Sequence, residues 1–126
     1  MTLDRAVGDD IQAILTANNL TPYWVGPGLM TDSEPATGVH DRISPPAIRA
    51  ADVALCQEGV HLYFPFTGVA GWLSWGDVAS IEPRGSDGIV AWFQLVARAQ
   101  ADFDGCDLGV AAQAGPNFAD AASRCI

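Results

Sequence analysis

The feature that most constrains the fold of this chain is an alternation of apolar residues with a period of two, which runs through residues 51–99. Side chains that alternate in this way point to opposite faces of a β-sheet. In residues 53–56 and 60–64 the large apolar residues occupy every second position, and Glu58 and Gly59 lie between the two runs. The pattern predicts a β-hairpin.

Two registers fit this hairpin. A two-residue loop at Glu58 and Gly59 pairs Val53 with Phe64 and brings the large apolar residues together on one face. A type I turn with Gly59 in a G1 bulge shifts the pairing by one residue. We favour the first register because it matches the apolar residues better.

Further strands are predicted at residues 72–75, 78–82 and 108–112, separated by segments rich in turn-forming residues. Residues 83–88 contain proline, two glycines and an aspartate, and this composition indicates a turn. Residues 89–99 form the longest predicted strand. Both of its faces are apolar near the middle, so we expect a central strand that is covered on both sides.

Helices are predicted at both ends of the chain. Residues 3–17 carry apolar side chains at helical spacing behind Thr2, and we expect this amphipathic helix to pack against the sheet of its own chain. Residues 118–125 show the same spacing.

Residues 23–25 are predicted as a short strand. Residues 26–46 contain many prolines and glycines and are predicted as a long loop, which is either functional or mobile.

The order of these features resembles that of the small bacterial pleckstrin-homology-like (PH-like or GRAM-like) domains. An apolar strand, an acidic-Gly turn and a second strand precede a Trp-x-Asp-hydrophobic signature, here Trp75, Asp77 and Val78, which leads to Ile81 and Glu82. The resemblance covers about residues 51–126. It implies a mainly β (α+β) fold in which two packed antiparallel sheets form a sandwich or partly open barrel, closed at one end by a C-terminal helix.

A length of 126 residues fits one domain that spans residues 1–126. In this interpretation residues 1–50 contribute the N-terminal helix and the Pro/Gly-rich loop. Residues 51–126 form the PH-like β core and the C-terminal helix.

The formal net charge is −9, with 15 acidic residues against 6 basic ones, all of them arginine. Such a surface repels phosphate backbones and anionic lipids, so nucleic acid and phosphoinositides are disfavoured as ligands.

No apolar run approaches the roughly 20 residues of a membrane span, and Asp4, Asp9 and Asp10 stand where a signal peptide would be basic and apolar. The 3 cysteines have no paired spacing, which favours reduced thiols and a cytoplasmic location.

Candidate catalytic and metal-binding residues are few. In the favoured register Cys56 lies opposite His61, and the pair is interpreted as a buried inert thiol beside a hydrogen-bonded imidazole rather than a nucleophilic dyad. His40 and Asp41 lie in the long loop without a nucleophile motif. Residues 102–107 lack the later ligands of a calcium loop, and no zinc or phosphate-binding motif is present. We therefore predict no catalytic residue, no metal and no cofactor.

Two hypotheses for the function follow. The favoured one is a non-enzymatic protein-binding module, such as a small acidic inhibitor or immunity-type protein that masks a partner with a basic surface; a homodimer is also compatible. The alternative is a small enzyme or ligand-binding protein that uses the 26–46 loop and the region of Cys56 and His61. The predicted contact surface for a partner comprises Tyr23, Trp24, Leu29, Met30, Asp32, Glu34 and Trp72.

Overall fold

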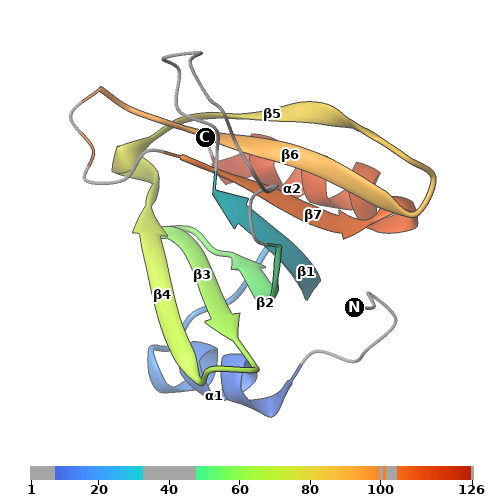
Figure 1. Ribbon diagram of the computed structural model, residues 1–126. Helices are drawn as coiled ribbons and strands as arrows, with labels where there is room; N and C mark the ends of the chain where they lie inside the picture. The colour runs from blue at the N-terminus through green and yellow to red at the C-terminus, as the bar shows by residue number, and fades with distance from the viewer. Residues whose placement is uncertain (1–7, 33–47, 100, 102–104, 126) are drawn as a thin grey trace.

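Figure 1 shows the computed structural model of the chain, which describes residues 8–32, 48–99, 101 and 105–125. Seven antiparallel strands form one sheet in the order β4-β3-β2-β1-β7-β6-β5. The strands are β1 (Trp24–Asp32), β2 (Arg49–Leu55), β3 (Gly59–Phe64), β4 (Val69–Ser74), β5 (Val78–Ser86), β6 (Val90–Ala97) and β7 (Cys106–Ala111). The helices are α1 (Asp9–Ala17) and α2 (Gly115–Cys125), with 3-10 turns η1 (Trp75–Asp77) and η2 (Ala112–Ala114).

The mainly β prediction with a helix near each end is confirmed. The expected pair of separate sheets is replaced by one open sheet, whose order begins at β4 and ends at β5. In Figure 1 the half formed by β5, β6 and β7 crosses the half formed by β2, β3 and β4 at a steep angle, with β1 between them. The sheet therefore bends over itself, and its two halves face a common core.

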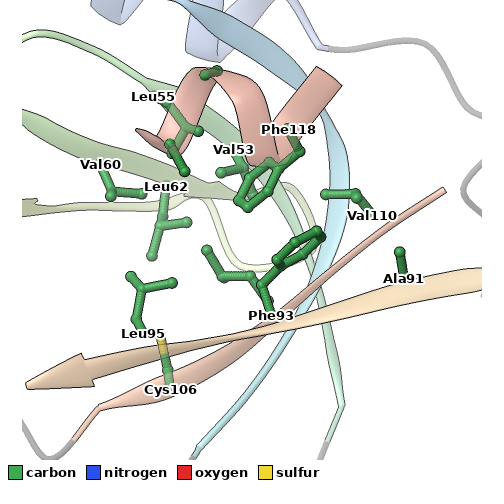
Figure 2. Packing of buried hydrophobic residues seen from close by; sticks show 13 residues of the cluster. Val53, Leu55, Val60, Leu62, Ala91, Phe93, Leu95, Cys106, Val110 and Phe118 are labelled. Atoms are coloured by element: carbon green, nitrogen blue, oxygen red, sulfur yellow. The ribbon is translucent and has the colours of Figure 1, made fainter. Parts of the chain in front are cut away.

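The main core lies between the two halves of the sheet and is closed by α2. Phe118 of α2 is fully buried, and its ring centroid lies 4.7 Å from that of Phe93 and 5.1 Å from that of Trp24. Figure 2 shows Phe118 pointing among side chains from both halves, including Val53 of β2 and Phe93 of β6. Helix α2 confirms the predicted C-terminal helix and begins three residues earlier than expected.

Helix α1 packs against the opposite face of β2 and β3. Its buried residues Ile11 and Leu15 contact Ala54 and Cys56 in a second, smaller cluster. The fully buried carboxylate of Asp52 accepts a hydrogen bond of 3.2 Å from the N–H of the residue before the helix, and a negative charge there also favours the helix dipole. The expectation that this helix packs on its own sheet is confirmed. The helix α1 begins at Asp9, and the first residues of the predicted helix, 3–7, lie outside the described part.

The prediction of a loop from residue 26 is wrong for residues 26–32, which belong to the central strand β1. Two features explain why Gly and Pro are found in a strand. A Cβ atom on Gly28 would lie 2.9 Å from the carbonyl oxygen of Gly109 in β7, so the two backbones approach too closely for a side chain. Pro27 lies just before the first residue of β1 that pairs with β7, a position where a missing N–H is tolerated. Residues 33–46 of the predicted loop lie outside the described residues.

The hairpin of β2 and β3 has neither predicted register. Val53 pairs with Leu62 rather than Phe64, so the two-residue loop is formed by Gln57 and Glu58. A slide of two residues leaves every side chain on its predicted face, because the period of a strand is two. Gly59 is thereby placed in β3, where a Cβ atom would overlap the carbonyl of Leu73 in β4.

Strand β5 is longer than predicted, because residues 83–86 continue the strand instead of forming a turn. The turn to β6 is short. The carboxylate of Asp87 accepts hydrogen bonds of 2.8 Å from the N–H groups of Val90 and Ile89, and these two bonds hold the pKa of Asp87 below its usual value.

Strand β6 begins at Val90 and pairs with β7 on one side and with β5 on the other, so it lies inside the sheet and is not an edge strand. Its core face is buried at Ala91, Phe93 and Leu95, whereas Ile89, the first residue of the predicted strand, lies before β6 and is exposed. The opposite face is half-buried. The apolar side chains on the second face are therefore only partly buried, and the strand is not covered on both sides as expected.

The close passage of β1 leads to a testable prediction. Gly28→Ala should lower the free energy of unfolding by about 1–3 kcal/mol, because the added methyl group overpacks the contact with β7. Gly71→Ala is the matched control: no atom lies within 4 Å of a Cβ atom at Gly71, and alanine in a strand is favoured over glycine by roughly 0.5–1 kcal/mol. Urea denaturation of both variants measures the difference, and equal stability would contradict the proposed packing.

A second prediction concerns two tryptophans. Trp24→Ala should lower the free energy of unfolding by about 3 kcal/mol, near the lower end for a buried aromatic residue, because the indole packs on Phe118. Trp72→Ala, at a side chain that is 53% exposed, should cost less than about 1 kcal/mol. Chemical denaturation followed by circular dichroism compares the two; a Trp24→Ala variant as stable as the parent would contradict this arrangement.

Candidate functional site

The outer edge of β4 is one of the two free edges of the sheet. Strand β4 ends the sheet order (Figure 1), and its first four residues are exposed. The strand contains no proline and no charged residue, and all six residues pair with β3 in an unbroken register. Proteins commonly protect an edge strand with such residues or with bulges, so within the described residues β4 is an unprotected edge.

The pairing with β3 defines which backbone groups of β4 point outward. The N–H of Trp75 donates to the carbonyl of Glu58 at 3.2 Å, and hydrogen-bonded pairs alternate with non-hydrogen-bonded pairs along an antiparallel ladder. Leu73, the next bonded position, therefore also faces β3. The N–H and C=O groups of the intervening residues Ala70, Trp72 and Ser74 point away from the sheet.

A pocket of about 500 Å³ lies on the α1 side of this edge. It is lined mainly by apolar side chains of α1 and β4, together with Glu58 and His61. The His61 ring stacks on the indole of Trp72, with centroids 5.6 Å apart and an interplanar angle of 17°. This stacking fixes the rim of the pocket directly beside the open edge.

A second hollow of about 400 Å³ lies where β4 begins, and Ile48, Phe64, Phe66 and Val69 contribute its apolar lining. Phe66 is 84% exposed, the highest value among the large apolar residues described. The guanidinium of Arg49 lies 5.1 Å from the centroid of the Phe64 ring, a cation–π arrangement at the same site. The side chain of Val69 is directed to the face opposite that of Ala70, so the two hollows flank β4 on different faces.

The other edge strand is protected. Strand β5 contains Pro83 and exposed charged residues, including Arg84. Its pairing with β6 is interrupted by two register shifts. Proline and bulges both prevent another strand from pairing along an edge. The two ends of the sheet therefore differ, and only β4 offers regular backbone groups.

A cluster of three metal-ligand side chains lies at the turn before β3. The ligand atoms of Cys56, Glu58 and His61 all lie within 4.8 Å of one another, and His61 Nε2 lies 3.0 Å from Glu58 Oε1. Burial raises the pKa of the Cys56 thiol to about 11, with smaller contributions from the charges of Glu58 and Cys125. The thiol is therefore protonated at neutral pH and is a poor nucleophile in the metal-free protein.

The predicted contact surface is divided between several environments. Trp24 and Met30 pack against the main core, and Leu29 is 8% exposed, whereas Tyr23 and Trp72 are about half exposed. Among the described members of this set, Trp72 lies at the β4 edge and the others do not. Asp32 ends β1, but its side chain lies outside the described part, as does Glu34. A role of this set in binding stays a prediction.

Sequence reasoning missed the apolar residues around the start of β4 and also missed Glu58 as a partner of His61. Phe66 follows a proline and precedes Thr67 and Gly68, a composition that indicates a turn but not an exposed apolar surface. The spacing of Cys56, Glu58 and His61 across a predicted hairpin is the signal that would have indicated the cluster. His40 and Asp41 of the long loop lie outside the described residues.

The environment of Cys56 predicts slow chemical modification. In metal-free protein with a chelator present, iodoacetamide should label Cys56 slowly at pH 7 and faster as the pH approaches 11, because only the thiolate reacts. His61→Ala should leave the rate at pH 7 unchanged. Peptide mass spectrometry resolves this cysteine from the other two, and rapid labelling at pH 7 that is lost in His61→Ala would restore the nucleophilic dyad.

Comparison with known proteins assigns no family to the chain, because no protein-family model matches it and no curated protein sequence matches it significantly. Within the described residues, no helix is both long enough and apolar enough to cross a membrane.

Proposed function

We propose that this chain is a non-enzymatic protein-binding domain that takes an extended segment of its partner onto the edge of β4. The observation that carries the proposal is the unprotected row of outward backbone groups at Ala70, Trp72 and Ser74, with an apolar hollow on each face. Strand addition of this kind gains affinity from main-chain hydrogen bonds and specificity from pockets that accept alternate side chains.

The two hollows match the side-chain alternation of an added strand. Residues of a bound segment at every second position would face the α1 side and contact Trp72 and His61. The residues between them would face the other side and contact Phe64 and Val69. An extended segment with apolar residues on both faces is therefore the favoured ligand. Aromatic side chains that are exposed in the free protein, such as Phe66, would be buried by the bound segment.

The charge of the protein favours a basic partner. With a net charge of −9, the long-range field accelerates association with a positively charged protein, and salt weakens that effect. A small acidic inhibitor that covers a basic target is one form of this function. The alternative of an enzyme centred on Cys56 and His61 is disfavoured, because burial raises the pKa of the thiol to about 11.

A PH-like fold is part of the same proposal. Its support is the meander order of the strands, with β1 pairing to β7 and a helix following the last strand. The signature residues Trp75 and Asp77 form η1 between β4 and β5. A cytoplasmic location is also proposed, and it is supported by three cysteines that have no paired spacing in the sequence.

The test uses a display library of extended basic seven-residue peptides selected on the immobilised parent protein. Ala70→Pro should weaken the selected peptides at least about tenfold, because proline removes an outward N–H without breaking the ladder to β3. Ala70→Ser keeps that N–H and should bind within about twofold of the parent. Calorimetric titration measures both affinities.

Amide hydrogen exchange provides the control for this experiment. A peptide on the edge should slow the exchange of the Ala70 and Trp72 amides and leave those of β5 unchanged. Both variants should melt close to the parent. If the selected peptides bind Ala70→Pro as tightly as the parent, or if the library yields no binder, strand addition at β4 is wrong. A dimer that Ala70→Pro dissociates would instead identify a second copy as the occupant.

A further inference from the structure

We infer that Cys56, Glu58 and His61 form a binding site for one zinc ion at the turn between β2 and β3. This inference goes beyond the proposed peptide-binding function and does not depend on it. The three side chains offer a thiol sulfur, a carboxylate oxygen and a ring nitrogen within 4.8 Å of one another. These are the three donor types by which Zn²⁺ is held in proteins.

The spacing of the donors suits a zinc ion after a small adjustment. Zinc–ligand bonds of about 2.0–2.3 Å place neighbouring ligand atoms roughly 3.3–3.8 Å apart around a tetrahedral ion. The distance of 3.0 Å between His61 Nε2 and Glu58 Oε1 is slightly shorter than this, and the 4.8 Å limit for the whole cluster is longer. Glu58 can supply the adjustment, because its side chain is 40% exposed and stands in the turn.

The other two ligands are held in place by the surrounding structure. The backbone N–H of Cys56 donates to the carbonyl of Gly59 at 2.9 Å, and the Cys56 carbonyl accepts a 2.7 Å bond from the Trp75 ring N–H. The His61 ring is fixed by its stacking on Trp72. Ligands fixed on strands need little ordering when a metal binds, which favours affinity.

The donor set selects the type of metal. Sulfur and imidazole ligands favour zinc and similar transition ions, whereas Mg²⁺ and Ca²⁺ prefer oxygen ligands alone. On binding, the S–H bond of Cys56 breaks, its proton passes to solvent, and the sulfur donates its electron pair to the ion with no change in oxidation state.

Three protein ligands leave the fourth tetrahedral position open. Glu58 and His61 both line the α1-side pocket of about 500 Å³, so the ion would lie at the wall of this pocket. Water or a donor atom of a bound molecule can then complete the coordination.

The experiment titrates the metal-stripped full chain with Co²⁺ and then with Zn²⁺. We expect one ion per chain, a thiolate-to-cobalt charge-transfer absorption band, and loss of that band when Zn²⁺ displaces Co²⁺. At a free Zn²⁺ concentration about 100 times Kd, the melting temperature should rise by roughly 10 °C.

Four variants separate this site from adventitious binding. Cys56→Ser should abolish the charge-transfer band, whereas Cys125→Ser, the matched control at a cysteine outside the cluster, should bind like the parent. His61→Ala and Glu58→Gln should each weaken Zn²⁺ binding at least about tenfold. Glu58→Gln changes an exposed side chain and therefore tests the site even if Cys56→Ser fails to fold.

Two results would overturn the inference. One is a parent protein that shows neither the cobalt–thiolate band nor a zinc-dependent change in melting temperature. The other is Zn²⁺ affinity that stays the same in the folded Glu58→Gln and His61→Ala variants. Because neither readout involves a peptide, failure here leaves the proposed function of the β4 edge unaffected.

Discussion

The fold depends on the close passage of β1 between β2 and β7. In the described sheet β1 pairs with β2 on one side and with β7 on the other, and its backbone comes so near to β7 that Gly28 lies against the carbonyl of Gly109. The two halves bend toward each other, and their inner faces share one core with Phe118 of α2. The strand order leaves β4 and β5 as the two free edges of the sheet.

Local sequence patterns predicted the strands wherever a strand has one apolar face, and they failed where tertiary contacts override the local signal. Val53 and Leu62 were assigned to the correct face, since the face depends only on the period of two. Their pairing depends instead on Gly59, which lies so close to the carbonyl of Leu73 in β4 that a side chain would not fit. Gly28 and Pro27 indicate a loop in isolation. They form a central strand because a neighbouring backbone, distant in sequence, requires a residue without a side chain.

The candidate sites were predictable to different extents. The proximity of Cys56 and His61 follows from the hairpin, and a slide of two residues preserves their common face, so the sequence indicates that pair. Glu58 joins them only because the turn is formed by Gln57 and Glu58. The open edge of β4 cannot be read from its own residues, since whether a strand is an edge depends on the order of all seven strands.

The two proposed sites are physically linked through His61. Its ring is a ligand in the inferred zinc site and also lines the α1-side pocket beside β4, where it stacks on Trp72. An ion that fixes this ring would reduce the ordering required when a peptide side chain enters the pocket, and by reciprocity the peptide would then strengthen zinc binding by the same factor. If the peptide instead required a different ring orientation, each ligand would weaken the other. Because β3 carries His61 and also pairs with β4, it connects both sites, and the sign of their coupling depends on the orientation of one imidazole.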